Sequence, residues 1–280
     1  LVIILAAGDS TRMKSSQSKV LHKIAGRSLI ENLLVSVDSL SPENLTVVVG
    51  AKKEEVINHL SEIAPKAKTV VQEKRDGTGS AARLALDNHK GDGTVLILAG
   101  DTPLLTKQTL QEFLAAHKTD GNKASVLTAQ LPDPTGYGRI IRGEQGEISK
   151  IVEEKDTTAD EKDIDEVNTG VYLFDISVLR KVIGDLKSNN AQKELYLTDA
   201  IALINQSGEK SFAILSNDYT ETLGINDRTQ LAEAAAIMRD RINHEHMQNG
   251  VTIIDPTTTW IDAQVKIEAD AFIYPGSAIT

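Results

Sequence analysis

An unbroken apolar run opens the chain and limits the fold more than any other stretch. Leu1 to Ala6 contains no polar residue and ends in Ala7-Gly8. A short run without alternation is typical of a β-strand whose two faces are both buried. A helical spacing of apolar residues follows, set by Leu29, Leu33, Leu34 and Val37. Together the two patterns predict one strand–helix unit.

The same alternation repeats through the first half of the chain. Strands are expected at residues 46–49, 69–71 and 94–99, and helices at residues 56–60, 81–86 and 110–116. Strands that alternate with helices at this spacing are joined by right-handed crossovers. We therefore expect an α/β fold with a doubly wound, mostly parallel sheet.

After Ala124 the pattern changes to strands with little helix between them. These strands are expected at residues 125–129, 138–142, 148–152 and 171–174. Helices resume at residues 176–183 and 198–204, and a short strand follows at residues 211–215. We interpret the strand-rich stretch as an insertion that faces the first half.

The last part of the chain has two further patterns. A long connecting helix is expected to begin near Asn226, with Leu231, Ala235, Met238 and Ile242 on one face. Beyond Gly250, isoleucines recur every six residues, at Ile261, Ile267, Ile273 and Ile279. That period is typical of hexapeptide-repeat β-helices, although a single ordinary strand and turn could also produce it. We expect three structural units. Residues 1–225 form the main α/β domain, residues 226–249 form the connecting helix, and residues 250–280 form a β-helix truncated after about one coil.

Composition excludes several classes of function. The 280 residues include 30 Lys and Arg against 40 Asp and Glu, a formal net charge of −10. Nucleic acid is therefore a poor ligand, and any cations that serve a phosphate must be local. The sequence has no cysteine, which excludes disulfides and thiolate chemistry and fits a reducing cytoplasm. Leu1 to Ala7 is too short for a membrane span, so we expect a soluble, cytoplasmic protein.

The loop after the first strand is the first candidate for chemistry. Small residues follow the strand, and two cations, Arg12 and Lys19, come next. Small residues let backbone N–H groups approach a phosphate, at the strand end where such sheets open into a ligand crevice. The loop is neither a Walker A loop nor a GxGxxG motif. From the residues alone, a tight turn with two solvated cations is equally compatible.

This loop, LAAGDSTRM from Leu5, resembles the signature L-A-A-G-x-G-T-R-M of the sugar-nucleotide pyrophosphorylases. The rest of the chain is similar to one branch of that family, the bifunctional N-acetylglucosamine-1-phosphate uridyltransferases and glucosamine-1-phosphate acetyltransferases. The matching segments, in family order, are VLHKIAG from Val20, QEKRDGTGSA from Gln72, AGDTPLL from Ala99, GYGRI from Gly136, IVEEKD from Ile151, NTGVY from Asn168, ELYLTD from Glu194, GIND from Gly224 and GVTIIDPTTTWID from Gly250.

The resemblance implies a Rossmann-like nucleotidyltransferase fold with a sugar-binding insertion and a left-handed β-helix. It also implies uridylyl transfer from UTP to N-acetylglucosamine 1-phosphate, giving UDP-N-acetylglucosamine for cell-wall precursors, and pyrophosphate. A full-length relative would also acetylate glucosamine 1-phosphate with acetyl-CoA and form a homotrimer. We expect no acetyl transfer and a weakened trimer from this chain.

The resemblance also assigns residues on the nucleotide side. Arg12 and Lys19 would be catalytic, because they neutralise charge on UTP and on the departing pyrophosphate. Gln72 would bind the uracil edge, with Gly77 and Thr78 closing over the base. The remaining implied nucleotide- or substrate-binding residues are Leu5, Ala6, Ala7, Gly8, Ala99 and Gly100.

The resemblance further implies a Mg²⁺ site on Asp101 and Asn226. Asp101 comes immediately after Thr94 to Gly100, at the carboxyl end of an expected buried strand. Magnesium keeps several waters and needs only one or two protein ligands beside substrate phosphates. Asn226 precedes an apolar-periodic helix, so it is also a candidate helix N-cap, and the two roles need not exclude each other.

On the sugar side, Gly138, Glu153 and Asn168 would bind the hydroxyls and the acetamido group, and Lys155 would hold the sugar phosphate. Paired acids such as Glu153 and Glu154 are also common on a solvated edge. His244 and His246 on the long helix are interpreted as surface residues. Ser10 and Ser80 stand where the family pattern has glycine and usually histidine, and Ser10 would be strained at a positive φ.

Two other functions are compatible with the sequence. A different sugar 1-phosphate, such as glucose 1-phosphate, would use the same nucleotide half. Alternatively, the chain could be a non-catalytic homologue that serves as a binding or oligomerisation module. Intact Arg12, Lys19 and Asp101 favour an enzyme.

Overall fold

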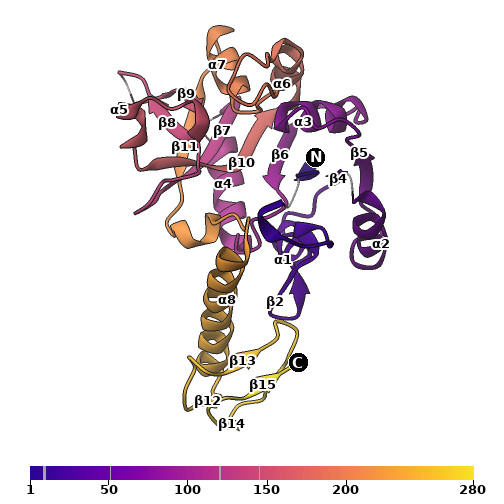
Figure 1. Ribbon diagram of the computed structural model, residues 1–280, viewed down its shortest axis with the longest axis vertical. Helices are drawn as coiled ribbons and strands as arrows, with labels where there is room; N and C mark the ends of the chain where they lie inside the picture. Colours follow the sequence, from indigo (N-terminus) through magenta and orange to yellow (C-terminus); the bar gives the residue numbers. More distant parts are fainter. Residues whose placement is uncertain (9–10, 51, 120, 145) are drawn as a thin grey trace.

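The computed structural model describes residues 1–8, 11–50, 52–119, 121–144 and 146–280. An α/β body forms the upper part of the molecule in Figure 1, and one long helix runs down from it. Short strands near the C-terminus lie at the lower end of that helix. Among the described residues, no helix is both long and apolar enough to cross a membrane.

The body is organised around a central sheet with the strand order β11-β7-β10-β6-β1-β4-β5. Its strands are β1 (Val2–Ala6), β4 (Leu45–Val49), β5 (Lys68–Val71), β6 (Thr94–Ala99), β7 (Ala124–Gln130), β10 (Glu166–Asp175) and β11 (Ser211–Leu215). Neighbouring strands are parallel except at β10, which is antiparallel to both β6 and β7. The expected mostly parallel sheet is therefore confirmed.

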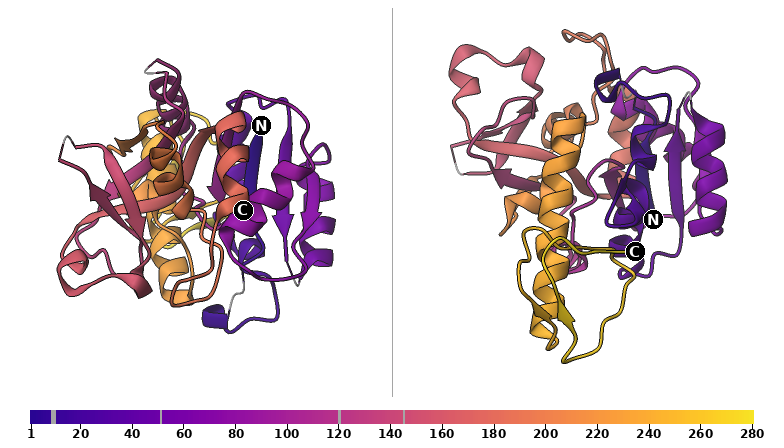
Figure 2. Two further views of the ribbon diagram at one scale, coloured as in Figure 1. Left: turned by 90° about the horizontal axis from the view of Figure 1, so that it is seen from above. Right: turned by 60° about the horizontal axis from the view of Figure 1, so that its bottom comes forward.

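Helices cover both faces of this sheet (Figure 2). On one face lie α3 (Thr78–Asp87), α6 (Ile176–Val182) and α7 (Asp199–Gln206), and on the other lie α1 (Leu29–Asp38), α2 (Lys53–Ile63) and α4 (Lys107–Thr119). Because side chains alternate along a strand, Ile3 packs in the first layer and Ile4 in the second, both with no exposed surface. This two-sided burial explains the unbroken apolar run of β1.

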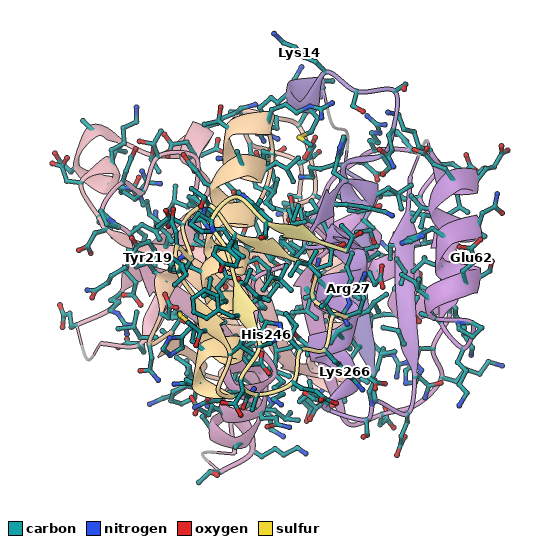
Figure 3. All side chains as sticks on the ribbon, turned by 90° about the horizontal axis from the view of Figure 1, so that it is seen from below. Lys14, Arg27, Glu62, Tyr219, His246 and Lys266 are labelled. Carbon is teal, nitrogen blue, oxygen red and sulfur yellow. The ribbon has the colours of Figure 1, made fainter. Side chains whose placement is uncertain are left out.

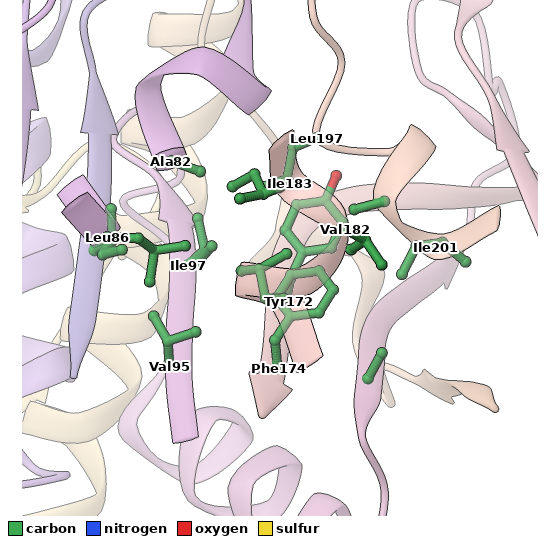
Figure 4. Packing of buried hydrophobic residues seen from close by; sticks show 14 of the residues in the cluster. Ala82, Leu86, Val95, Ile97, Tyr172, Phe174, Val182, Ile183, Leu197 and Ile201 are labelled. Carbon is green, nitrogen blue, oxygen red and sulfur yellow. The ribbon is translucent and has the colours of Figure 1, made fainter. Parts of the chain in front are cut away.

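Figure 4 shows the first layer, where α3 packs on β6 and the rings of Tyr172 and Phe174 lie beneath α6. Elsewhere α1 begins with a capping box, in which the Ser28 hydroxyl accepts from the Glu31 N–H and the Glu31 carboxylate accepts from the Ser28 N–H.

The strand-rich stretch differs in one respect from the expectation. β8 (Arg139–Arg142) and β9 (Ile148–Val152) form a branch that is attached to the sheet through β10. The strands expected at residues 125–129 and 171–174, however, belong to the central sheet as β7 and β10. Short elements complete the body: η1 (Thr11–Met13), η2 (Lys19–Leu21), β2 (Lys23–Ile24), β3 (Arg27–Ser28), η3 (Glu154–Asp156), α5 (Ala159–Lys162), η4 (Ile183–Asp185) and η5 (Tyr219–Thr222).

The long helix α8 (Arg228–Gln248) begins two residues later than Asn226, and its N-cap is Asp227. The Asp227 carboxylate accepts hydrogen bonds from the backbone N–H groups of Thr229 and Gln230, both at 2.9 Å. The interpretation of Asn226 as the N-cap is therefore wrong by one residue. On this helix His244 is exposed. His246, which is labelled in Figure 3, is half-buried.

Beyond α8 the chain forms the short strands β12 (Thr252–Ile253), β13 (Trp260–Ile261), β14 (Phe272–Ile273) and β15 (Ala278–Ile279). Ile253 pairs with Ile273, and Ile261 pairs with Ile279, in parallel. The isoleucines expected at six-residue intervals share one apolar cluster with Ile242 of α8. Ile261, Ile273 and Ile279 therefore come from three separate short strands, with Ile267 in the connection between β13 and β14, rather than from a single strand and turn. The Ala263 N–H donates to the Ala25 carbonyl at 3.0 Å, which ties this coil to the turn between β2 and β3.

The start of α6 gives a pH-dependent prediction. The Asp175 carboxylate accepts from the Ser177 and Val178 N–H groups at 2.9 and 3.4 Å and from Lys123 Nζ at 3.0 Å. Burial raises the Asp175 pKa, but bonds from Ser177 and Lys123 lower it more, to about 2. Because the folded pKa lies below the ordinary value, this stabilisation is complete above about pH 4 and is lost as the pH falls through about 2.

We predict that Asp175→Ala lowers the free energy of unfolding at pH 7 by about 1 kcal/mol, the usual loss for a helix N-cap. Urea titrations at several pH values should show the difference from wild type shrinking between about pH 4 and pH 2. Asp185→Ala, at an exposed position, serves as the control and should leave the stability unchanged. If the difference in the free energy of unfolding does not vary with pH, ionisation of the Asp175 carboxylate does not contribute to stability.

Candidate active site

A cavity of about 440 Å³ lies at the carboxyl ends of β1 and β6. The chain passes from β1 to β4 and β5 on one side and then returns to β6 on the other side of β1. The order of the strands therefore reverses between β1 and β6, and ligands of doubly wound sheets bind at such a point. The lining residues are Leu5, Ala6, Ala7, Gly8, Lys19, Val20, Gln72, Arg75, Gly77, Thr78, Ala81, Ala99, Asp101, Glu153, Asn168, Gly170, Tyr172, Glu194 and Leu197.

Most residues expected from the sequence line this cavity, although they come from distant segments. The exceptions are Arg12, Gly100, Gly138, Lys155 and Asn226, which are not among the lining residues. Arg12 is exposed on η1 and Lys155 is exposed on η3. Ser10 lies outside the described residues, so its φ remains a prediction.

The loop after β1 forms the floor of the cavity. At Gly8, apart from its chain neighbours, none of the described residues has a heavy atom within 4 Å of the position that a Cβ would take, so the backbone there is open to a ligand. Gly100 lies behind the floor, where its N–H donates to the Leu5 carbonyl at 2.9 Å. A Cβ on Gly100 would lie 3.1 Å from that carbonyl oxygen, so this glycine allows the ends of β1 and β6 to approach each other.

Lys19, Asp101 and Asn226 meet at one side of the cavity. The Lys19 ammonium forms an ion pair with the Asp101 carboxylate, and its Nζ also donates to Asn226 Oδ1 at 3.0 Å. The Ile225 N–H donates to the Asp101 carbonyl at 2.9 Å, which aligns the two segments. Because Asp227 caps α8, the Asn226 side chain is free to face this cluster. Two oxygen donors thus converge on one cation.

Gln72 and Gly77 form the wall beside the N-terminus of α3. The Gln72 side chain is buried, and its Nε2 donates to the Gly77 carbonyl at 3.1 Å and to Asp76 Oδ1 at 3.4 Å. With the amide hydrogens used in this way, Oε1 is the atom that can accept a bond from a ligand.

Backbone hydrogen bonds fasten this wall to the segment at residues 195–197. The Leu195 N–H donates to the Asp76 carbonyl at 2.7 Å, and the Gly79 N–H donates to the Leu195 carbonyl at 2.8 Å. The Thr78 hydroxyl accepts from the Leu197 N–H at 3.0 Å. The two segments therefore form one rigid wall.

Glu153 also lines the cavity, and it accepts a hydrogen bond from the Thr198 hydroxyl at 2.9 Å. Burial raises the Glu153 pKa, the Thr198 bond opposes that shift, and the acidic neighbours Asp199, Asp156 and Glu194 raise the pKa further. Next to it, Glu154 forms an ion pair at 2.8 Å with Arg139, whose side chain is 2% exposed. The acidic segment is thus anchored by a buried cation, rather than lying on a solvated edge.

Asn168 lies on β10 where the pairing with β7 shifts register. Its Oδ1 accepts from the Gly170 N–H at 3.1 Å, and its Nδ2 donates to the Tyr172 hydroxyl at 2.7 Å. The Gly138 carbonyl accepts from the Asn168 N–H at 2.8 Å. Gly138 therefore supports Asn168 from behind the cavity.

Seven lining residues were not singled out from the sequence: Val20, Arg75, Ala81, Gly170, Tyr172, Glu194 and Leu197. All seven fall inside or directly beside segments that carried the family resemblance. The motifs were thus the available signal, but a motif does not say which of its side chains face the ligand.

Gly77 gives a prediction about the rigid wall. Its φ is +108°, and a Cβ there would lie 2.3 Å from the Leu195 carbonyl oxygen. We predict that Gly77→Ala lowers the free energy of unfolding by about 3 kcal/mol, because backbone strain and a clash with main chain add. Gly93→Ala is the matched control, since Gly93 has a φ of +101° with nothing within 4 Å of its Cβ position. Equal losses in urea titrations would show that the Leu195 contact does not matter.

A family model described as "MobA-like NTP transferase domain" matches residues 2–154. This range contains β1, β6 and the cavity residues from Leu5 to Glu153.

Whole-chain relatives are also found. The chain is 46% identical over 281 aligned residues to "Bifunctional protein GlmU" of Streptomyces coelicolor, covering 99% of this chain and 58% of that protein. It is 46% identical over 280 aligned residues to the protein of the same name from Shouchella clausii, with 99% of this chain and 61% of that protein covered. The chain therefore spans about three fifths of the length of these relatives, and the resemblance expected from its motifs is confirmed.

Solved structures share the fold. A putative glucose-1-phosphate thymidylyltransferase from Bacillus anthracis, solved with a sucrose, has a TM-score of 0.66 and 22% identity, covering 85% of this chain and 95% of that one. HddC from Yersinia pseudotuberculosis has a TM-score of 0.63 and 16% identity, with coverages of 85% and 98%. At these identities the likeness concerns the fold alone.

The family model covers more than half of the chain, and the site it contains lies where a doubly wound sheet binds its ligand. The chain therefore belongs to the family of MobA-like NTP transferase domains.

Proposed function

We propose that this chain is a sugar-nucleotide pyrophosphorylase that transfers a uridylyl group from UTP to N-acetylglucosamine 1-phosphate, releasing pyrophosphate. One observation carries the proposal: a single cavity is lined by three groups of residues suited to the two substrates. Gln72 can accept a hydrogen bond from a nucleotide base, and Lys19, ion-paired with Asp101, lies in the same cavity. Glu153 and Asn168 provide polar side chains for a sugar. The whole-chain relatives named GlmU support the choice of substrates.

The reaction needs no covalent intermediate. A phosphate oxygen of the sugar phosphate is already ionised, and it attacks the α-phosphorus of UTP in line. What the protein must supply is alignment of two anions and cancellation of their repulsion. Lys19, inside the cavity, is suited to this task as it stands. Arg12 is exposed on η1, and it would contribute if that turn closes over the triphosphate.

A divalent cation fits the donors at Asp101 and Asn226. Both are hard oxygen ligands of the kind that Mg²⁺ prefers, and both already contact one positive charge, the Lys19 ammonium. Bound Mg²⁺ would offset charge on the triphosphate, and Lys19 would then be available to a phosphate oxygen.

The direct test measures pyrophosphate release from UTP with N-acetylglucosamine 1-phosphate, with and without Mg²⁺. Glucose 1-phosphate serves as the competing acceptor at saturating UTP. Preference for the glucose compound would replace the proposed acceptor. Absence of Mg²⁺-dependent turnover with either acceptor would favour a non-catalytic module.

Gln72 gives a prediction about the base. The N3–H of uracil can donate to Gln72 Oε1, whereas N3 of cytosine, in the same pose, is an acceptor that would face this acceptor oxygen. We therefore expect kcat/KM for UTP to exceed that for CTP by at least about 10²-fold. Rates with the two nucleotides under identical conditions decide this, and equal rates would remove Gln72 from base recognition.

Lys19 gives a second prediction. Lys19→Ala should lower turnover by about 10²-fold or more, because it removes one preorganised electrostatic donor. Lys23→Ala, at a nearby exposed position, is the control and should stay close to wild type. Thermal melting should confirm that both variants fold. A Lys19 variant within a few-fold of wild type in pyrophosphate release would refute the assigned role.

A further inference from the structure

Tyr172 is a core residue whose hydroxyl also makes a specific hydrogen bond beside the cavity. Its side chain is buried, and its ring stacks on Phe174 with centroids 5.8 Å apart and planes inclined by 18°. Figure 4 shows both rings within the packed layer beneath α6, with the Tyr172 hydroxyl at the end remote from Phe174. Tyr172 also lines the cavity. The apolar ring alone would satisfy the packing, so the hydroxyl needs a separate explanation.

A β-bulge brings this hydroxyl to Asn168. Asn168 pairs with Thr128, but the next pair along β10 is Val171 with Leu127, so Thr169 and Gly170 are extra residues. Gly170 takes a φ of +79°, and the Thr169 hydroxyl donates to the Leu127 carbonyl at 2.7 Å. In a regular strand, residues four apart are separated by about 13 Å along the strand, too far for this contact. The bulge shortens that distance and directs Asn168 into the cavity.

The Asn168 carboxamide is held at both ends. The Gly170 N–H can only donate, so the group facing it at 3.1 Å must be the acceptor Oδ1. Nδ2 then lies toward the Tyr172 hydroxyl, to which it donates at 2.7 Å. Burial, together with the nearby Glu153 carboxylate, raises the pKa of Tyr172, so the hydroxyl stays neutral at physiological pH. One N–H of the carboxamide remains for a ligand.

We propose that Tyr172 is a positioning residue, whose hydroxyl fixes the Asn168 carboxamide so that its remaining N–H is presented to the carbonyl oxygen of the acetamido group. This role rests on the proposed acceptor, N-acetylglucosamine 1-phosphate. It concerns recognition of the sugar, and the nucleotide side of the cavity does not depend on it.

Tyr172→Phe tests this role because it keeps the ring and removes only the hydroxyl. The KM for N-acetylglucosamine 1-phosphate should rise about tenfold, the usual effect of losing one buried hydrogen bond. The KM for UTP and kcat should change by less than about twofold, because a ground-state contact to the sugar is affected. Tyr274→Phe is the control, since Tyr274 is exposed in the coil after α8 and does not line the cavity. A rise in both KM values together would indicate a merely structural role and overturn the proposal.

A double-mutant cycle separates action through Asn168 from direct contact. In an Asn168→Ala background, Tyr172→Phe should have no further effect on the KM for the sugar phosphate. The same tenfold rise in that background would show that Tyr172 does not act through Asn168. The proposal would then be wrong.

A spectroscopic readout keeps this proposal separate from the proposed substrate. The side-chain amide of Asn168, assigned through its loss in Asn168→Ala, can be followed by ¹⁵N NMR without any ligand. In the wild-type chain one of its two hydrogens should be protected from exchange, and Tyr172→Phe should abolish that protection. Equal, rapid exchange of both hydrogens in wild type would overturn the contact itself. If protection is seen but N-acetylglucosamine 1-phosphate is not a substrate, the proposed function fails while the positioning of Asn168 stands.

Discussion

Burial of β1 on both faces is the constraint on which the rest of the structure depends. Ile3 and Ile4 face opposite helix layers, and β1 also pairs with β4 on one side and with β6 on the other. Full burial of one such side chain contributes about 1.5–3 kcal/mol, so a polar residue here would weaken both layers. The chain fills the two sides of β1 by adding β4 and β5 on one side and then crossing over to add β6 on the other. The cavity lies at this reversal of strand order, and its floor is the loop that leaves β1.

The arrangement of layers could be read from the sequence because two-sided burial leaves a strong local pattern. β6 shows the same unbroken apolar run as β1, and α1 shows the spacing of a helix packed on one face. The division between sheet and insertion could not be read in this way. β7 and β10 look like other strands in sequence, and only their pairing partners place them in the central sheet.

The sequence predicted several residues of the candidate site but not the contacts between them. Family motifs located Lys19, Asp101 and Asn168, and the structure brings all three to one cavity. The motifs did not reveal that the Lys19 ammonium contacts Asp101, or that Asn168 reaches Tyr172, because both contacts depend on tertiary geometry. The second also requires a bulge, and a glycine at residue 170 could equally have indicated a turn. The helix cap was missed by one residue, since Asn226 and Asp227 are both good capping residues.

The hydrogen bonds between residues 76–79 and 195–197 limit the routes by which a ligand can enter the cavity. Main-chain hydrogen bonds on both sides of Gly77 join the two segments, so the segments cannot separate without breaking several hydrogen bonds at once. A ligand of the cavity is therefore not expected to pass between these two segments.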